Sequence, residues 1–167
     1  SAINDAIYTA RIFSNMDFDS VSIYESIDTY RIPSSRKEEI YMNFKTYEKY
    51  ISKGFKTRDK AAEDRIARSC SCYICKSPMK RRIKWFATSS KNYYSVFVCD
   101  EHGLFKGRMK VKQSDDGQCY DVRILKHTDE AGVNKIIDKQ KKEREHRRRK
   151  RMEEHKRKVE ARNSCNK

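Results

Sequence analysis

The chain has 167 residues, of which 38% are charged and 37% hydrophobic, and its formal net charge is +15. This length suits one domain, or two small modules with a tail, around a core of limited size. The excess of Lys and Arg favours a polyanionic partner. No apolar run approaches the roughly 20 residues of a membrane span, so we expect no membrane association.

The first 69 residues are predicted to form a small helical bundle. Ser35 and Glu38 have the spacing of a capping box, and apolar residues recur from Ile40 to Ile51 at helical intervals. Thr57 is a second candidate N-cap. The predicted helices cover residues 2–13, 20–30, 35–54 and 57–69.

Residues 70–127 have a different character and are predicted to form two β-hairpins. The segments 81–87 and 93–99 are rich in β-branched and aromatic residues and flank the turn-type stretch 88–92. In the second hairpin, apolar and basic residues alternate over 108–112, and Asp116-Gly117 is a strong turn signal. The returning strand covers residues 120–126.

Two pairs of metal-type ligands flank the first hairpin at equal internal spacing: Cys72 and Cys75, then Cys99 and His102. A two-residue gap lets one tight turn present two ligands to one ion, and two such turns complete a tetrahedron. The pattern therefore predicts one structural Zn²⁺, held by these four side chains in a treble-clef or ribbon-like module. Cys70 or His127 could replace one of the four. The alternatives are disulfides, or four unrelated residues.

The tail, residues 128–167, is predicted to be an extended basic helix. Thr128, Asp129 and Glu130 suit a helix N-terminus, and Val133, Ile136 and Ile137 can dock on the folded part. No aliphatic residue lies between Asp138 and Met152. We therefore expect residues 139–163 to be helical, but to pack on nothing in this chain beyond about Ile137.

The positive charge is concentrated in residues 76–112 and 139–163, each with a net charge of +8. Lys and Arg neutralise phosphates, and interleaved aromatics can stack on unpaired bases. The alternatives are that the basic side chains only solvate a strand face or a helix, and that Trp85 belongs to the core of the small zinc module. The candidate nucleic-acid contacts are Lys80, Arg81, Arg82, Lys84, Trp85, Arg108, Lys110, Arg147, Arg148, Arg149, Lys150 and Arg151.

These features favour a zinc-containing nuclear protein that binds RNA or DNA. We expect it to be a subunit of a chromatin or RNA-processing assembly. The Arg/Lys run at 147–151 also suits a nuclear-import signal. We expect no enzyme and no small-molecule substrate, because four protein ligands leave no open metal position and the chain has no Gly-rich phosphate loop. The alternative is a protein-interaction scaffold that docks partner proteins through residues 1–69, with the tail as anchor or import signal.

Overall fold

The computed structural model describes residues 2–15 and 32–165. Contacts divide the chain into two units, Ser1–Ile32 and Pro33–Lys167. In the first unit, α1 (Ala2–Ser14) confirms the helix predicted over 2–13, and none of its residues is buried. The helix predicted over 20–30 lies outside the described residues.

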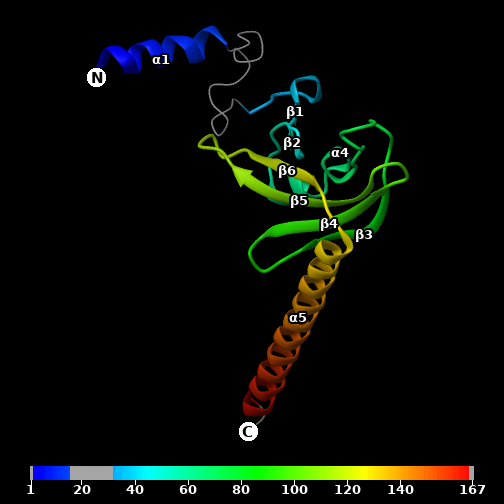
Figure 1. Ribbon diagram of the computed structural model, residues 1–167. Helices are drawn as coiled ribbons and strands as arrows, with labels where there is room; N and C mark the ends of the chain where they lie inside the picture. Colours follow the sequence, from blue (N-terminus) through cyan, green and yellow to red (C-terminus); the bar gives the residue numbers. More distant parts are fainter. Residues whose placement is uncertain (1, 16–31, 166–167) are drawn as a thin grey trace. The chain divides into compact units, whose positions relative to one another are not determined.

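The second unit is built on a six-stranded antiparallel sheet (Figure 1). Its spatial order is β1-β2-β6-β5-β4-β3, so the central hairpin β5–β6 is flanked by β2 on one side and β4 on the other. The strands are β1 (Ile40–Asn43), β2 (Tyr47–Ile51), β3 (Lys80–Ala87), β4 (Asn92–Cys99), β5 (Gly103–Gln113) and β6 (Cys119–His127).

The helix predicted over 35–54 is wrong, and the predicted helical bundle fails with it over residues 40–51. Glu38 accepts hydrogen bonds from the backbone N–H and hydroxyl of Ser34, but only the short 3₁₀ turn η1 (Arg36–Glu38) follows. The chain then forms the β1–β2 hairpin, in which Ile40 lies opposite Ile51. β2 in turn pairs with β6, so this segment extends the sheet.

The helix predicted over 57–69 is present as two short helices, α3 (Arg58–Ala62) and α4 (Arg65–Arg68). Thr57 caps α3 as predicted, and the Asp64 carboxylate caps α4 by accepting from the backbone N–H of Ala67. Both helices pack on one face of the sheet, which we call the α3/α4 face. Their buried alanines contact Val111 and Met109 there.

Both predicted hairpins of residues 70–127 are confirmed. Asp116-Gly117 lies in the β5–β6 turn, where Gly117 has a φ of +76°. Ser114 closes this turn by donating its backbone N–H to the carbonyl of Gln118. β4 and β5 pair without a shift from Asn92 opposite Lys110 to Cys99 opposite Gly103.

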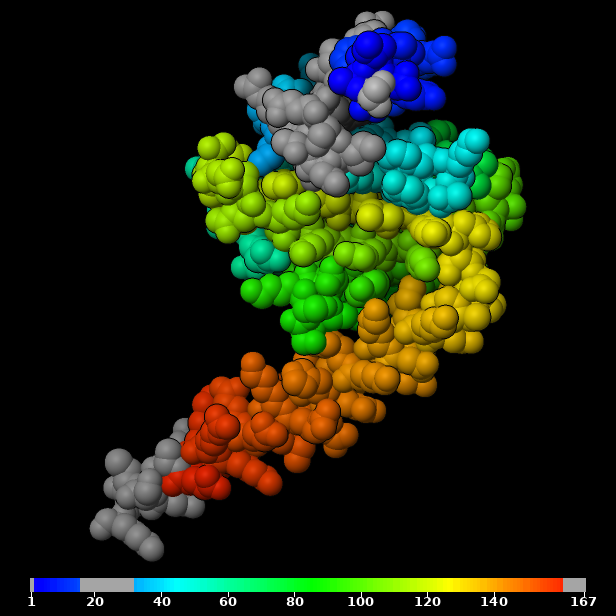
Figure 2. All heavy atoms as spheres, turned by 60° about the vertical axis from the view of Figure 1, so that its left-hand side comes forward, coloured from blue at the N-terminus to red at the C-terminus, as the bar shows by residue number. Residues whose placement is uncertain are grey.

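The C-terminal helix α5 (Glu130–Cys165) confirms the predicted basic helix. Val133 and Ile136 are buried against Val96 and its neighbours on the opposite side of the sheet, which we call the α5 face. Figure 2 shows the distal half of α5 standing clear of the sheet. Within the described part of the chain, no helix has the length and apolar character needed to cross a membrane.

The prediction that α5 packs on nothing beyond about Ile137 is wrong. Lys139 Nζ lies 4.4 Å from the ring centroid of Tyr94. Further along, a Glu143 carboxylate oxygen accepts from the backbone N–H of Ser89 at 3.0 Å, and Arg147 Nη2 donates to the carbonyl of Ala87 at 2.5 Å. Polar side chains thus hold α5 on the tip of the β3–β4 hairpin, without aliphatic residues.

Candidate metal centre and basic surface

Cys72 and Cys75 lie on a tight turn that precedes β3. The turn is closed by backbone hydrogen bonds from Cys72 N–H to the Ser77 carbonyl and from Lys76 N–H to the Cys72 carbonyl, both at 2.8 Å. Lys76, directly after the second ligand, has a φ of +62°. This left-handed conformation is unusual for a residue with a side chain.

Cys99 and His102 occupy the corresponding positions of a second turn, which joins β4 to β5. Cys99 is the last residue of β4 and pairs with Gly103 across the hairpin. Gly103, directly after the second ligand, has a φ of +74°. The two turns therefore share one backbone plan, in which a left-handed residue follows each ligand pair.

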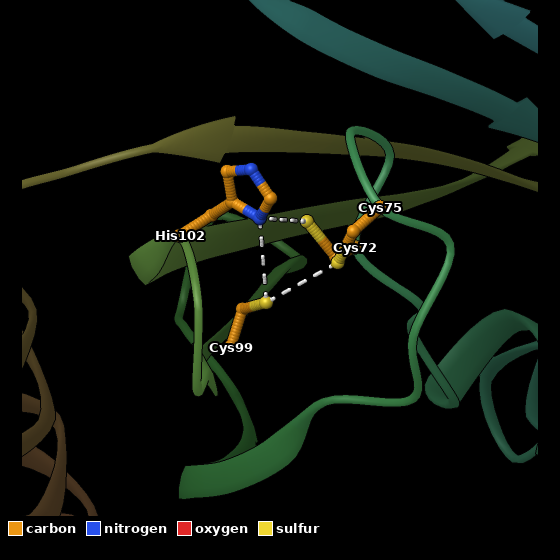
Figure 3. Close-up of side chains that lie close together, drawn as sticks. All are labelled: Cys72, Cys75, Cys99 and His102. Atoms are coloured by element: carbon orange, nitrogen blue, oxygen red, sulfur yellow. Dashed lines mark hydrogen bonds between the residues drawn. The ribbon is translucent and has the colours of Figure 1, made fainter.

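The four side chains point toward one another (Figure 3). The Sγ atoms of Cys75 and Cys99 lie 3.6 Å apart, and the Nδ1 atom of His102 lies 3.8 Å from the Sγ atoms of both Cys72 and Cys99. All four ligand atoms lie within 4.8 Å of one another.

This arrangement fits a metal ion better than a disulfide. With bonds of about 2.0–2.3 Å, a tetrahedral ion separates its sulfur and nitrogen ligands by about 3.6–3.8 Å. A disulfide requires a sulfur–sulfur distance of about 2.05 Å, and Cys72, Cys75 and Cys99 are free. Cys72, Cys75, Cys99 and His102 can therefore hold a metal ion.

The ionisation of Cys75 favours metal binding as well. Hydrogen bonds from the side chain and backbone of Ser77 lower the pKa of the Cys75 thiol to about 6. Since the thiolate is the form of cysteine that binds metals, the loop favours the required state.

Neither of the two alternative ligands belongs to the cluster. Burial raises the pKa of the Cys70 thiol to about 11, which favours the neutral form. His127 Nε2 donates to the backbone carbonyl of His102 at 3.0 Å, and its ring packs edge-on against Phe105. His127 thus supports the turn that carries His102.

The basic residues of β3 are largely occupied within the protein. Lys80 Nζ lies 3.1 Å from the Asp100 carboxylate, and Arg82 pairs with Glu130 at 2.6 Å. Arg81 donates to the backbone carbonyl of Arg68.

Trp85 does not belong to the surface that carries the β5 cations. Its indole N–H donates to the Arg68 carbonyl at 2.9 Å, and its ring packs on Phe97 on the α3/α4 face. Lys84 is exposed and lies in a groove beside α5 that Arg144 and Arg147 also line. The structure therefore does not bring Trp85 together with Arg108 and Lys110.

Four cations alternate along β5 on the α5 face, and all are exposed. Directly paired residues of an antiparallel sheet point to the same side. The register therefore adds Lys126, which lies opposite Lys106. The acidic strand residues Glu48 and Asp121 pair with Leu125 and Val111, both on the α3/α4 face. The four β5 cations are Lys106, Arg108, Lys110 and Lys112.

Part of this surface is hollowed where the first turns of α5 leave the sheet. A cleft of about 530 Å³ lies between them. The cations that line it are Lys106, Arg108, Lys126, Lys135 and Lys139. Sequence reasoning named only Arg108. Lys106 and Lys126 continue the strand alternation by one step, a signal that could have identified them, whereas the helix–sheet packing that adds Lys135 and Lys139 leaves no local pattern.

In the Arg/Lys run at 147–151, the first residue contacts other parts of the protein and the other four are exposed. Arg147 contacts Ala87 and lies 3.6 Å from Glu143. The next four residues, Arg148, Arg149, Lys150 and Arg151, are exposed.

No protein-family model, no curated protein and no solved structure matches this chain.

Proposed function

We propose that the protein binds the phosphate backbone of a nucleic acid through the α5 face of its sheet and the exposed part of α5. One observation carries this proposal. Every cation of β5 projects from one face, and both acidic residues of the six strands point away from it. A row of Lys and Arg with no acidic strand residue on the same face concentrates positive potential, which favours a polyanion.

In this proposal the metal is Zn²⁺ and its role is structural. Three sulfurs and one imidazole nitrogen suit zinc, and four protein ligands leave no open position for water or substrate. The ion would fix the β4–β5 turn, which starts the strand bearing the cations. The chain then acts by binding rather than by catalysis, in the nucleus, where the run at 147–151 would also serve import.

Salt-dependent binding tests this function. For single-stranded and duplex oligonucleotides of mixed sequence, log K should fall linearly with log salt. Lys110→Glu with Lys112→Glu, or deletion of residues 148–167, should each weaken binding and flatten the slope. The matched control is Lys45→Glu with Lys60→Glu, two exposed lysines outside the α5 face. Unchanged slopes in both test variants would reject the proposal.

A protein-docking role for residues 1–69 is a second candidate, and α1 favours it. Ile3, Ile7, Tyr8 and Ile12 are each at least 47% exposed. Clusters of exposed apolar residues mark interaction sites more often than chance. Deleting residues 1–32 should leave oligonucleotide binding intact if the two roles occupy different parts of the chain. A fall in affinity equal to that of the Lys110/Lys112 variant would contradict this division.

A further inference from the structure

The cleft beside α5 differs from the rest of the basic surface in shape. Its floor is formed by β5 and β6 around Gly107 and Ile124, and its wall by the first turns of α5. Its volume of about 530 Å³ falls within the range of pockets that enclose a small organic ligand. A group of nucleotide size can therefore enter it.

The charge of the cleft is only partly neutralised by the protein. None of its five cations takes part in an ion pair among the described residues, whereas Lys80, Arg82 and Arg123 elsewhere each have a carboxylate partner. Lys106 lies directly opposite Lys126 in the β5–β6 register. Like charges in this position destabilise a sheet, so the arrangement costs stability unless an anion lies between them.

The one carboxylate that lines the cleft is already engaged. Asp129 Oδ1 accepts from the backbone N–H of Gly132 at 2.8 Å, which caps the start of α5. Backbone hydrogen bonds, chiefly from Gly132, lower the pKa of Asp129, and the positive charges of Lys135 and Lys106 lower it further. Asp129 therefore caps the helix and also offsets part of the charge of Lys106 and Lys135, but it is one carboxylate among five cations, so most of the positive charge of the cleft is not compensated.

The aromatic residue that lines the cleft, Tyr94, contacts a lysine, so its ring is not free to stack on a base. Lys139 Nζ lies 4.4 Å from the centroid of the Tyr94 ring, a distance typical of cation–π contacts. The Tyr94 ring also contacts the Phe86 ring, and both rings pack against α5. Tyr94 therefore positions Lys139, and phosphates rather than bases are the groups that the cleft is equipped to recognise.

We propose that this cleft binds successive phosphates of an unpaired nucleic-acid strand. The inference rests on the proposed function and specifies its ligand. A flexible single strand can lay its backbone between α5 and the sheet. A duplex carries its phosphates on a stiff convex surface, which the helix wall keeps from the floor. Because no base edge is contacted, binding should depend little on sequence.

The test compares oligo(dT) with a blunt duplex of the same length, by fluorescence anisotropy. Lys106→Gln with Lys126→Gln should weaken oligo(dT) binding about tenfold and reduce its salt slope by about 1.4, since each phosphate contact on a single strand contributes about 0.7. Duplex affinity should change less than about twofold. Lys45→Gln with Lys60→Gln removes the same charge outside the cleft and should leave oligo(dT) affinity within about twofold.

Two further measurements separate a binding role from a structural one. At low salt and without oligonucleotide, the Lys106/Lys126 variant should unfold at a higher temperature than the wild type, because cross-strand repulsion is removed. Tyr94→Leu keeps an apolar contact with α5 but removes the ring beneath Lys139. It should weaken oligo(dT) binding about threefold, within the range of an exposed cation–π contact.

The outcomes distinguish the two proposals. Equal losses on single strand and duplex would overturn the cleft proposal and leave general backbone binding intact. If the wild type bound neither oligonucleotide, both proposals would be wrong. If inorganic tripolyphosphate displaced oligo(dT) at a lower phosphate concentration than unlabelled oligo(dT), the cleft would belong to a small polyphosphate and the strand proposal would be overturned.

Discussion

Trp85 lies so close to Gly107 that a Cβ atom at Gly107 would come within 2.8 Å of the indole Cη2 atom. The same Cβ would lie 3.2 Å from Phe97 Cε2. Both rings belong to the core of the α3/α4 face, so neither can move without disturbing its neighbours. Gly107→Ala should therefore lower the free energy of unfolding by about 1–3 kcal/mol, as overpacking does.

Guanidinium unfolding would measure this loss. Gly117→Ala separates steric crowding from backbone strain, because Gly117 has open space around it but a φ of +76°. Because Gly107→Ala crowds the Trp85 ring, it should lower the free energy of unfolding less in a Trp85→Leu background than in the wild type. Simple additivity of the two losses would contradict it.

The metal centre predicts a stoichiometry of one zinc per chain. Cys99→Ser should abolish binding and destabilise the β4–β5 turn, because structural zinc contributes folding free energy directly. Cys70→Ala and Cys119→Ala are the controls, since both are free cysteines outside the cluster. Elemental analysis should show full zinc occupancy in both, and loss of zinc in either control would mean that the ligand set is misassigned.

The two ligand turns make opposite predictions for glycine. Lys76 has a φ of +62°, so Lys76→Gly should relieve backbone strain and raise the free energy of unfolding by up to about 1 kcal/mol. Gly103→Ala introduces that strain at a φ of +74° with no neighbour within 4 Å, and should lower it by about 1 kcal/mol. Thermal unfolding of zinc-saturated protein would check both signs, and a shift of the same sign in both variants would contradict the shared backbone plan.

Asp121 makes stability depend on pH. It is fully buried, and neither carboxylate oxygen has a hydrogen-bond partner in the described part of the chain. Burial raises the pKa of Asp121 to about 7. Because the unfolded pKa is about 3.9, the folded state holds this proton more tightly, and its stabilising effect is lost as pH rises from about 4 to 7.

Asp121→Asn should remove this dependence. At pH 8 the variant should be more stable than the wild type by roughly 1–3 kcal/mol, and the difference should shrink below pH 5. Chemical unfolding at the two pH values measures it. Asp115→Asn, in the exposed β5–β6 turn, should show no such change. A constant difference for Asp121→Asn at both pH values would mean that its carboxylate does not titrate in this range.

Contacts of α5 predict where protection from hydrogen exchange ends. Amides up to about Arg147 should exchange slowly, because Glu143 and Arg147 attach the helix to the hairpin tip. Those of residues 152–165 should exchange fast. Glu143→Ala with Arg147→Ala should move the boundary back to about Lys139. Uniform protection along α5 in the free protein would contradict this assignment.

Sequence patterns were reliable where spacing itself carries the chemistry. Two ligand pairs with equal gaps predicted the cluster of Cys72, Cys75, Cys99 and His102, because metal coordination needs those residue types on tight turns. The alternation of Met109 and Val111 with charged residues predicted the correct faces of β5, because successive side chains of a strand point to opposite faces.

Patterns failed where two periods fitted one segment. Ile40, Phe44, Tyr47 and Ile51 match a helical stripe, but Ile40 and Ile51 match a hairpin equally well, with the turn between them. The segment forms strands because β2 pairs with β6, about 70 residues further along the chain, and a local pattern does not contain this long-range pairing. The sequence could not predict which side of the sheet Trp85 faces, because β3 is irregular between Arg81 and Phe86 and simple alternation does not apply there.

The length of α5 has a consequence for any ligand that binds both the sheet and the far end of this helix. The helix has 36 residues, which corresponds to about 54 Å, and its attachment ends near Arg147. The residues beyond Arg147 project from the sheet as a rigid helix. The length of this helix and its rotation of about 100° per residue therefore fix where its side chains can make a second contact. Inserting one residue after Arg151 would turn the far side chains by about 100°, whereas inserting seven would nearly restore their direction about 10 Å further out.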